Sequence, residues 1–217
     1  MIVDFKPRLY QETIFSSSAQ KNSLVVLPTG LGKTAVALMM LAHRSSMYPN
    51  SKIVVLAPTK PLVEQHMQYF MEHLRNHDDD FSLFTGMISP AKRKELWENS
   101  KFIFSTPQGL ENDIISGRIT LEDVSLFIFD EAHRATGDYS YVFIASQYEK
   151  KGRYPRILAL TASPGSDKEK IDEICSNLFI ENIEVRTSED PDVKPYVQET
   201  KTSWKEVDLP HDFLQIK

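Results

Sequence analysis

The sequence has almost no cysteine and no long apolar run. Cys175 is the only cysteine among 217 residues, so no internal disulfide can form and a reducing compartment is indicated. No apolar run approaches the length that spans a bilayer, and the first residues lack a basic start followed by a long apolar core. These absences predict a cytoplasmic location, at the nucleoid if the organism is prokaryotic, and no membrane partner.

An excess of basic residues is also missing. The net charge is −5, with 30 acidic against 25 basic side chains, whereas nucleic-acid-binding domains usually carry a basic surface. Any assignment of nucleic-acid binding must therefore rest on local motifs. The 6 histidines and the single cysteine show no zinc-ligand spacing. His66, His73 and His77 lie on or near one predicted helix, where we expect them to face solvent.

What is present is a regular alternation of apolar runs with segments of helical period. The expected strands are 23–27, 52–57, 81–85, 101–105, 125–129, 156–161 and 182–185. The expected helices are 7–18, 33–47, 60–76, 90–98, 107–116, 139–150 and 168–178. Several strands are continuous apolar runs, which are typical of parallel strands covered on both sides. The alternation predicts an α/β fold with a mostly parallel β-sheet and helices on both faces. Ligands of such sheets bind beyond the carboxyl ends of the strands.

The character of the sequence changes near residue 187. The stretch from Arg186 to Pro195 is polar and holds two prolines, which is typical of a linker. We predict one domain over residues 1–186. Residues 187–217 are then a linker and the start of a following insertion or second domain, with a further strand expected at 202–209.

A glycine-rich segment lies between an apolar run and a helical run. Its two glycines allow backbone amides to turn toward phosphate oxygens, and the N-terminus of the helix adds partial positive charge. Lys33 is expected to reach the β- and γ-phosphates of a nucleotide, and Thr34 to bind magnesium. The general phosphate-loop pattern has glycine where Leu27 stands, so a structural glycine turn is the alternative. The expected nucleotide-binding residues of this segment are Thr29, Gly30, Leu31, Gly32, Lys33 and Thr34.

An acidic motif, Asp130-Glu131-Ala132-His133, directly follows the apolar run 125–129. A carboxylate at a strand end can hold magnesium opposite a phosphate loop, which is the role expected of Asp130. Glu131 can orient the water that attacks the γ-phosphate, so we take Glu131, Asp130 and Lys33 as the catalytic set. His133 is a candidate for coupling this site to the rest of the molecule. The alternative is an acidic helix start, since carboxylates favour the first turn of a helix.

The motifs follow a recognisable order and spacing. They are Tyr10-Gln11, Pro28–Thr34, Ala57–Leu62, Asp130–His133 and Thr161–Ser163. This arrangement resembles the N-terminal RecA-like domain of a superfamily 2 DEAH-box helicase. The segments 57–66, 106–113, 130–135, 161–165 and 189–196 resemble the archaeal Hef and FANCM group in particular. RIG-I-like and Dicer-like helicases share much of the pattern.

The resemblance implies a RecA-like P-loop domain that binds ATP and Mg²⁺. It implies the motor domain of a DNA helicase or translocase that acts on branched or forked DNA in repair. A second RecA-like domain of the same full-length chain would supply the arginine that stabilises the transition state. An RNA-directed relative and a nucleotide-gated binding module without turnover remain alternatives. A transporter-type ATPase would need a Leu-Ser-Gly-Gly-type signature, and none is present.

The resemblance also implies roles for residues outside the two phosphate-site motifs. Gln11 resembles the glutamine that reads adenine, with Arg8 and Tyr10 close enough to pack on the base. A solvent-facing helix residue is the alternative for Gln11. Thr161 and Ser163 resemble the motif that links the nucleotide state to the grip on nucleic acid, and their hydroxyls can reach the acidic loop. A simple turn is compatible with the same residues.

Three further sites resemble the family's contacts with the nucleic-acid backbone. Each site follows an expected strand, so all three should lie on one edge of the sheet. Contacts of this kind with sugar and phosphate carry little base specificity. For each threonine alone, capping of a helix is an equally good interpretation. The residues concerned are Thr59, Lys60, Thr85, Gly86, Thr106 and Gln108.

Overall fold

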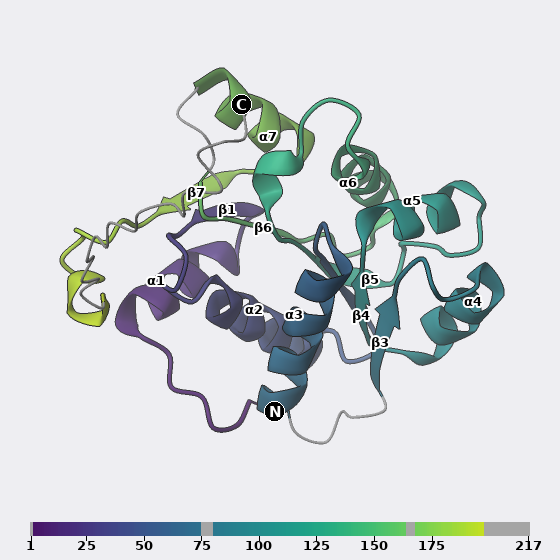
Figure 1. The fold of residues 1–217 in the computed structure, drawn as a ribbon, viewed down its shortest axis with the longest axis horizontal. Coiled ribbons are helices and arrows are strands. Elements are labelled where there is room, and N and C mark those ends of the chain that lie inside the picture. Colours follow the sequence, from purple (N-terminus) through teal and green to yellow (C-terminus); the bar gives the residue numbers. More distant parts are fainter. Residues whose placement is uncertain (1, 75–79, 164–167, 198–217) are drawn as a thin grey trace, which may run out of the picture.

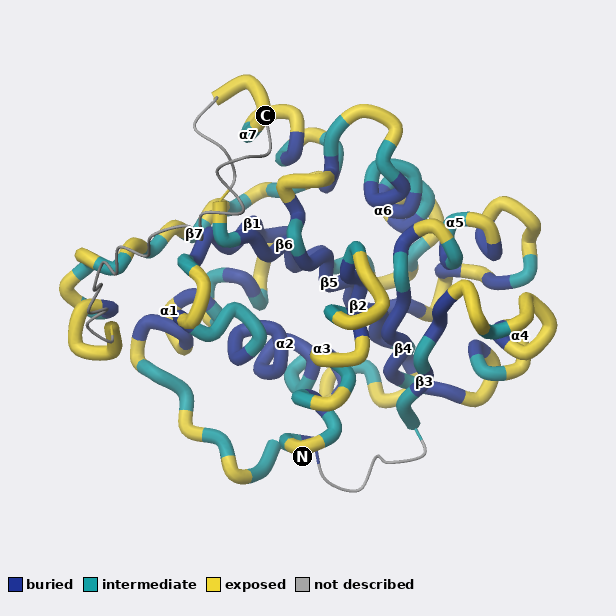
Figure 2. Tube along the Cα trace, in the orientation of Figure 1, coloured by how far each residue is buried: buried dark blue, intermediate teal, exposed yellow. Residues whose placement is uncertain are grey.

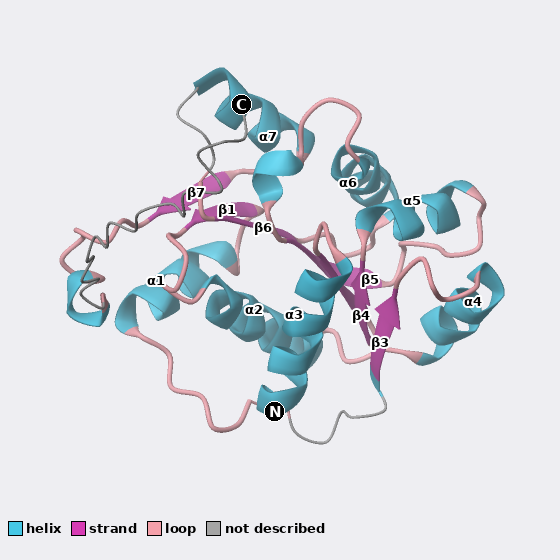
Figure 3. Cartoon of the chain, in the orientation of Figure 1, coloured by secondary structure: helices cyan, strands magenta, loops and turns pink. Residues whose placement is uncertain are grey.

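The computed structural model describes residues 2–74, 80–163 and 168–197. Within these ranges the chain forms one seven-stranded sheet with the strand order β3-β4-β2-β5-β6-β1-β7. Every pair of neighbouring strands in this sheet is parallel (Figure 3). The strands are β1 Ser23–Val26, β2 Lys52–Leu56, β3 Phe81–Phe84, β4 Phe102–Ser105, β5 Val124–Phe129, β6 Ile157–Thr161 and β7 Asn182–Val185.

Helices cover both faces of this sheet. Figure 1 shows α1, α2 and α3 on one face and α4, α5, α6 and α7 on the other. The helices are α1 Leu9–Ser18, α2 Lys33–Met47, α3 Lys60–His73, α4 Pro90–Asn99, α5 Pro107–Ile115, α6 Ser140–Lys151 and α7 Lys168–Asn177. Two short 3₁₀ turns, η2 Ala132–Arg134 and η3 Lys194–Tyr196, complete the elements used below. In the described ranges, no helix combines the length and apolarity needed to cross a membrane.

Each face of the sheet has its own apolar core, because successive strand residues point to opposite sides. In β5, Phe127 and Phe129 belong to the core beneath α4–α7, whereas Leu126 and Ile128 belong to the core beneath α1–α3. All six residues of β5 are buried, and Figure 2 shows the central strands as the most buried part of the chain. A strand buried on both sides explains the continuous apolar runs in the sequence.

The expected α/β fold with a mostly parallel sheet and helices on both faces is confirmed. All seven expected strands and all seven expected helices are present, with ends that move by at most a few residues. The expected strand at 202–209 lies outside the described residues. The arrangement is a RecA-like fold, and the phosphate-loop segment, the acidic motif and the three backbone-contact sites all follow strands at one edge of the sheet.

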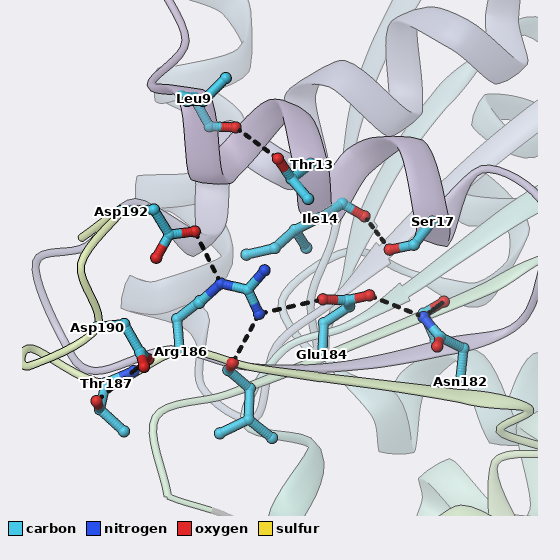
Figure 4. Close-up of polar contacts among 12 residues, drawn as sticks. Leu9, Thr13, Ile14, Ser17, Asn182, Glu184, Arg186, Thr187, Asp190 and Asp192 are labelled. Carbon is cyan, nitrogen blue, oxygen red and sulfur yellow. Dashed lines mark hydrogen bonds and ion pairs between the residues drawn. The ribbon is translucent and has the colours of Figure 1, made fainter.

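The segment after β7 packs back against α1 and the core beneath it. Arg186 donates from Nε to Asp192 Oδ2 at 3.1 Å, and its Nη1 lies 3.4 Å from Glu184 Oε2 (Figure 4). Val193 is fully buried in the core that contains α1. The ring of Tyr196 lies 5.8 Å from that of Tyr10. Val193 and Tyr196 therefore hold this segment against the rest of the fold, and the boundary between residues 186 and 187 stays a prediction.

Replacement of Val193 by alanine tests how firmly this exit segment is held. Val193→Ala removes buried methyl groups, so it should lower the free energy of unfolding by about 1–3 kcal/mol. Val185→Ala is the matched control, because Val185 is 49% exposed on β7 and should change stability by less than about 0.5 kcal/mol. Urea titration of both variants gives the comparison. Equal stability losses would mean that Val193 does not anchor the segment.

Candidate active site

The glycine-rich loop begins where β1 ends and stops where α2 begins. Gly30 and Gly32 have φ angles of +85° and +79°, a backbone region that favours glycine. The loop therefore depends on its glycines to turn from the strand into the helix. Lys33 is the first residue of α2, and its Nζ donates to Leu27 O at 3.2 Å, across the loop. Thr34 follows in the first turn of the helix and is partly exposed.

Helix α1 holds this loop from the side. Tyr10 donates its hydroxyl to Leu31 O at 2.6 Å, and Gln11 donates from Nε2 to the same carbonyl at 3.2 Å. Gln11 Oε1 accepts from the backbone N–H of Arg8 at 2.9 Å. A carboxamide has two donor hydrogens and two acceptor lone pairs, so Gln11 keeps one of each for a ligand. Gln11 is 4% exposed and is not the solvent-facing residue of the alternative interpretation.

The expectation that Tyr10 packs on a base is wrong. Tyr10 has no exposed surface, and its ring is part of the core beneath α1. Its hydroxyl is used to fix the Leu31 carbonyl. Arg8 remains partly exposed, donates to the Tyr10 hydroxyl at 3.1 Å and lies over the ring of Tyr196 at 5.1 Å from its centre.

The acidic loop begins directly at the end of β5. The backbone N–H of Asp130 donates to Leu56 O at 2.9 Å, so the pairing with β2 continues to this residue. Tyr141 on α6 donates its hydroxyl to Asp130 O at 2.8 Å. Glu131 has a φ of +52°, which is uncommon for a residue with a side chain. The turn that it makes leads directly into η2, and its side chain stays partly exposed.

The two carboxylate oxygens of Asp130 have different surroundings. Oδ2 lies 2.6 Å from Nε2 of His66, which comes from α3. Oδ1 is buried and has no hydrogen-bond partner among the described residues. A buried carboxylate oxygen without a partner is costly unless a bound group satisfies it. This oxygen, together with the Thr34 hydroxyl, is the kind of hard oxygen donor set that magnesium prefers.

The solvent-facing position expected for His66 is wrong. His66 is 7% exposed and points toward the acidic loop. Its position was detectable in the sequence, since Val63, His66 and Phe70 follow the spacing of one helix face and all three are buried. His73, on the same helix, is half-buried, with Nδ1 3.3 Å from Val3 O. His77 lies outside the described residues.

The glycine-rich loop and the acidic loop line the same cleft. Its volume is about 580 Å³, and its wall is completed by one side of α3. The lining residues are Thr29, Gly30, Gly32, Lys33, Thr34, Ala35, Leu62, Gln65, His66, Gln68, Tyr69, Glu72, Asp130 and Glu131. The α3 residues were not anticipated from the sequence. The expected nucleotide-binding residues Leu31, Gln11 and Arg8 are not among the lining residues.

His133 connects the acidic loop to the loop after β6. Its Nδ1 lies 3.2 Å from Thr161 Oγ1 and 3.3 Å from Glu131 Oε2. The Thr161 hydroxyl also donates to Ser163 O and accepts from Ser163 N–H, both at 3.2 Å. The expected contact between a hydroxyl of this motif and the acidic loop is present. The turn interpretation holds as well, because Thr161 ties the backbone of Ser163.

The three remaining sites follow β2, β3 and β4, which are neighbours in the sheet. Thr59, Lys60, Gly86 and Gln108 are exposed, Thr106 is half-buried and Thr85 is buried. The site after β3 therefore presents Gly86, around whose Cα there is open space, rather than the Thr85 side chain. Lys60 Nζ lies 3.3 Å from Met87 Sδ, which joins the first two sites. Neither Thr59 nor Thr106 caps its helix through its side chain.

Tyr139 lies close to two of the expected site segments. Burial raises the pKa of the Tyr139 hydroxyl above its ordinary value, and the nearby Arg134 and Gln108 side chains partly offset this rise. Tyr139 therefore lies near both the site after β4 and η2 of the acidic loop.

The contact between Gln11 and Gly32 generates a test of the loop. A Cβ on Gly32 would lie 2.4 Å from Gln11 Nε2, whereas a Cβ on Gly30 would meet no atom within 4 Å. Both glycines have positive φ, so each alanine variant should lose about 1–2 kcal/mol of stability from the backbone alone. Gly32→Ala should lose more than Gly30→Ala, because it also displaces the Gln11 amide from Leu31.

The double variant Gly32→Ala/Gln11→Ala isolates this effect. Removal of the Gln11 amide relieves the clash, so the two substitutions should cost less together than the sum of their separate losses in chemical denaturation. Gly30→Ala/Gln11→Ala is the control, for which the losses should add. Additive losses in both pairs would refute the packing of Gln11 against the loop.

Comparison with known proteins gives a consistent result. Residues 4–166 match the family described as Type III restriction enzyme, res subunit. The chain is similar to a putative ATP-dependent RNA helicase of Methanocaldococcus jannaschii, with 47% identity over 206 residues, 95% of this chain and 26% of that protein. It is also similar to the DEAD-box ATP-dependent DNA helicase Fancm of Drosophila melanogaster, with 40% identity over 194 residues, 88% of this chain and 13% of that protein.

A solved structure extends the similarity to the fold. The Hef helicase domain of Pyrococcus furiosus superposes with a TM-score of 0.89 and 47% identity, and the match covers 99% of this chain and 46% of that chain. This chain thus spans about a quarter or less of the curated relatives described above and under half of the solved one. Because the family match extends over most of the chain, the chain belongs to this family of helicase domains, and its relatives are Hef, Fancm and Mph1 helicases.

Proposed function

We propose that this chain is the first RecA-like motor domain of an ATP-dependent DNA helicase or translocase. In this proposal the full-length protein hydrolyses ATP and acts on branched or forked DNA in repair. The observation that carries the proposal is the shared cleft, in which the glycine-rich loop faces Asp130 and Glu131. The Drosophila Fancm and fungal Mph1 relatives are named as ATP-dependent DNA helicases, which supports DNA as the substrate.

ATP is proposed to bind with its phosphates on the glycine-rich loop. Backbone amides from Thr29 to Gly32 and the N-terminus of α2 donate to the phosphate oxygens. Lys33 leaves Leu27 O to reach the β- and γ-phosphates. Gln11 uses its remaining donor and acceptor on the adenine, and Arg8 stacks on the base from the exposed side of α1.

Magnesium is proposed to bind to the Thr34 hydroxyl and the Asp130 carboxylate. The unpartnered Oδ1 of Asp130 fits this role, because a cation or its water would satisfy it. When bound, the ion neutralises charge on the β- and γ-phosphates. Glu131 is proposed to orient and polarise the attacking water, since its partly exposed carboxylate lies in the same cleft. His133 then holds Glu131 and Thr161 together as the contact between the nucleotide site and the loop after β6.

Nucleic acid is proposed to bind along the ends of β2, β3 and β4. Lys60 and the N-terminus of α3 contribute positive charge, while Gly86 and the hydroxyls of Thr59 and Thr106 contribute donors for the sugar–phosphate backbone. Such contacts position a strand and carry little sequence information. We place this motor domain at residues 1–186, with residues 187–217 as the connection to the next domain, and the protein in the cytoplasm at its DNA.

A second RecA-like domain is proposed to complete the site. No arginine lines the cleft within the described residues, and phosphoryl transfer enzymes of this type use an arginine to stabilise the transition state. Closure of the two domains around ATP, followed by reopening after hydrolysis, would move the strand.

Residues 1–217 alone should therefore bind ATP weakly and hydrolyse it very slowly. Loss of an arginine finger typically costs on the order of 10³–10⁵ in rate. Phosphate release by this segment and by the full-length protein, each with and without forked DNA, measures the difference. Rapid DNA-stimulated turnover by residues 1–217 alone would defeat the two-domain proposal.

Lys33→Ala should abolish most nucleotide binding while leaving the fold intact. Loss of one charge-assisted contact to phosphate corresponds to roughly 10- to 100-fold weaker binding. Titration with labelled ATP gives the affinity, and circular dichroism reports the fold. Lys150→Ala is the matched control, because Lys150 is an exposed lysine on α6 and does not line the cleft. Unchanged affinity of Lys33→Ala for ATP would contradict the phosphate-loop assignment.

A competition binding experiment decides between DNA and RNA as the substrate. Full-length protein should bind forked DNA in preference to duplex RNA of matched length. Both affinities are measured at the same salt concentration, because phosphate contacts are salt-dependent. The Methanocaldococcus relative is named as an RNA helicase, which makes this comparison necessary. Preferential binding to duplex RNA, with ATPase stimulation by RNA alone, would replace the DNA proposal with the RNA-directed alternative.

A further inference from the structure

One short contact in the cleft, between α3 and the acidic loop, has no role in the proposed function. His66 Nε2 lies 2.6 Å from Asp130 Oδ2, and both residues are almost fully buried, at 7% and 4% exposed. Neither the phosphate-loop assignment nor the resemblance of the motifs assigns a role to His66. Yet this contact decides which of the two carboxylate oxygens of Asp130 is left for a ligand.

The contact is asymmetric in a way that points to a ligand. Oδ2 is occupied by His66, and Oδ1 is buried with no partner in the described part of the chain. The backbone of Asp130 is fixed independently, because its N–H donates to Leu56 O and its carbonyl accepts from Tyr141. The remaining freedom of the residue is rotation of its carboxylate. A donor at Oδ2 removes that freedom and keeps Oδ1 available.

The imidazole of His66 is itself held by packing. His66 lies on the buried face of α3 between Val63 and Phe70, which are 1% and 0% exposed. An imidazole held in this way is a rigid hydrogen-bond donor to Asp130, whereas a water molecule in the same place would exchange with bulk solvent. A residue that hydrogen-bonds to a metal-binding carboxylate, without touching the metal, fixes the orientation of that carboxylate. Loss of such a residue typically lowers metal affinity 10- to 100-fold.

We propose that His66 is a positioning residue that holds the Asp130 carboxylate so that Oδ1 stays free for the magnesium ion of bound MgATP. This inference rests on the proposed function. The contact would serve the divalent cation and not the nucleotide as such, so loss of the donor should weaken metal binding and leave metal-free nucleotide binding unchanged.

The test uses the full-length protein, with Mn²⁺ as a spectroscopic substitute for Mg²⁺. Binding of Mn²⁺ to the protein–ADP complex is followed by electron paramagnetic resonance, and binding of labelled ADP is measured in EDTA. His66→Leu should weaken Mn²⁺ binding about 10- to 100-fold and should change ADP affinity in EDTA by less than about threefold. His66→Gln retains an N–H donor and should restore most of the Mn²⁺ affinity.

Two controls separate positioning from a purely structural role. His73→Leu makes the same change on the same helix outside the cleft, and Mn²⁺ affinity should not change. In an Asp130→Ala background, His66→Leu should have no further effect on Mn²⁺ binding, because the carboxylate that it positions is gone. If His66→Leu does not fold, His66→Met replaces it in every arm, and thermal melting shows which variants are folded.

The results distinguish failure of the His66 inference from failure of the proposed function. If wild-type protein binds no nucleotide and no Mn²⁺–ADP, the proposed function fails, and the inference fails with it. If wild-type protein binds both and His66→Leu matches it, only the His66 inference is overturned. Parallel loss of Mn²⁺ and metal-free ADP binding in His66→Leu, or equal losses in His66→Leu and His66→Gln, would also overturn it.

Discussion

The structure depends on the parallel direction of all its paired strands. Parallel strands deliver every connecting loop that follows them to one edge of the sheet, so segments far apart in the sequence meet there. β6 is the only strand between β1 and β5, and this spacing puts the glycine-rich loop and the acidic loop on two sides of one cleft. Asp130 is placed where the ladder stops, because its N–H still pairs with β2 while its side chain is already in the cleft.

The strand order divides this edge into two halves. The loops after β1 and β5 line the cleft together with one side of α3, and the loops after β2, β3 and β4 build the proposed groove. Two physical links cross the boundary. Helix α3 begins at the groove with Lys60 and reaches Asp130 through His66, and Tyr139 lies near both Gln108 and Arg134 of the acidic loop. A contact of this kind can transmit a change from the nucleotide site to the groove only if the contacting residues have two alternative arrangements. In this fold, closure against a second domain would provide the second arrangement.

The sequence predicted the sheet, the helices and the two loops because each is encoded locally by apolar runs, glycines and helix starts. It failed where side chains from different elements meet. His66 has the period of a buried face, but its partner Asp130 comes from the loop after β5, far away in the sequence, so solvent exposure was wrongly expected. Tyr10 stands beside Gln11, yet its ring enters the core and its hydroxyl holds Leu31. Such contacts follow from packing between elements, which no local pattern specifies.

Electrostatics explains why this cleft needs further cations. Lys33 is the only lysine or arginine among the described residues that line it, whereas Glu72, Asp130 and Glu131 are three carboxylates. A triphosphate placed on the glycine-rich loop would add several negative charges to a wall that is already acidic, and like charges at short range in a partly desolvated site repel strongly. Backbone amides and one lysine cannot offset this repulsion alone. In the proposed function, a divalent cation at Asp130 and an arginine from a facing domain would supply the missing charge, so nucleotide, metal and partner domain would bind as one linked event.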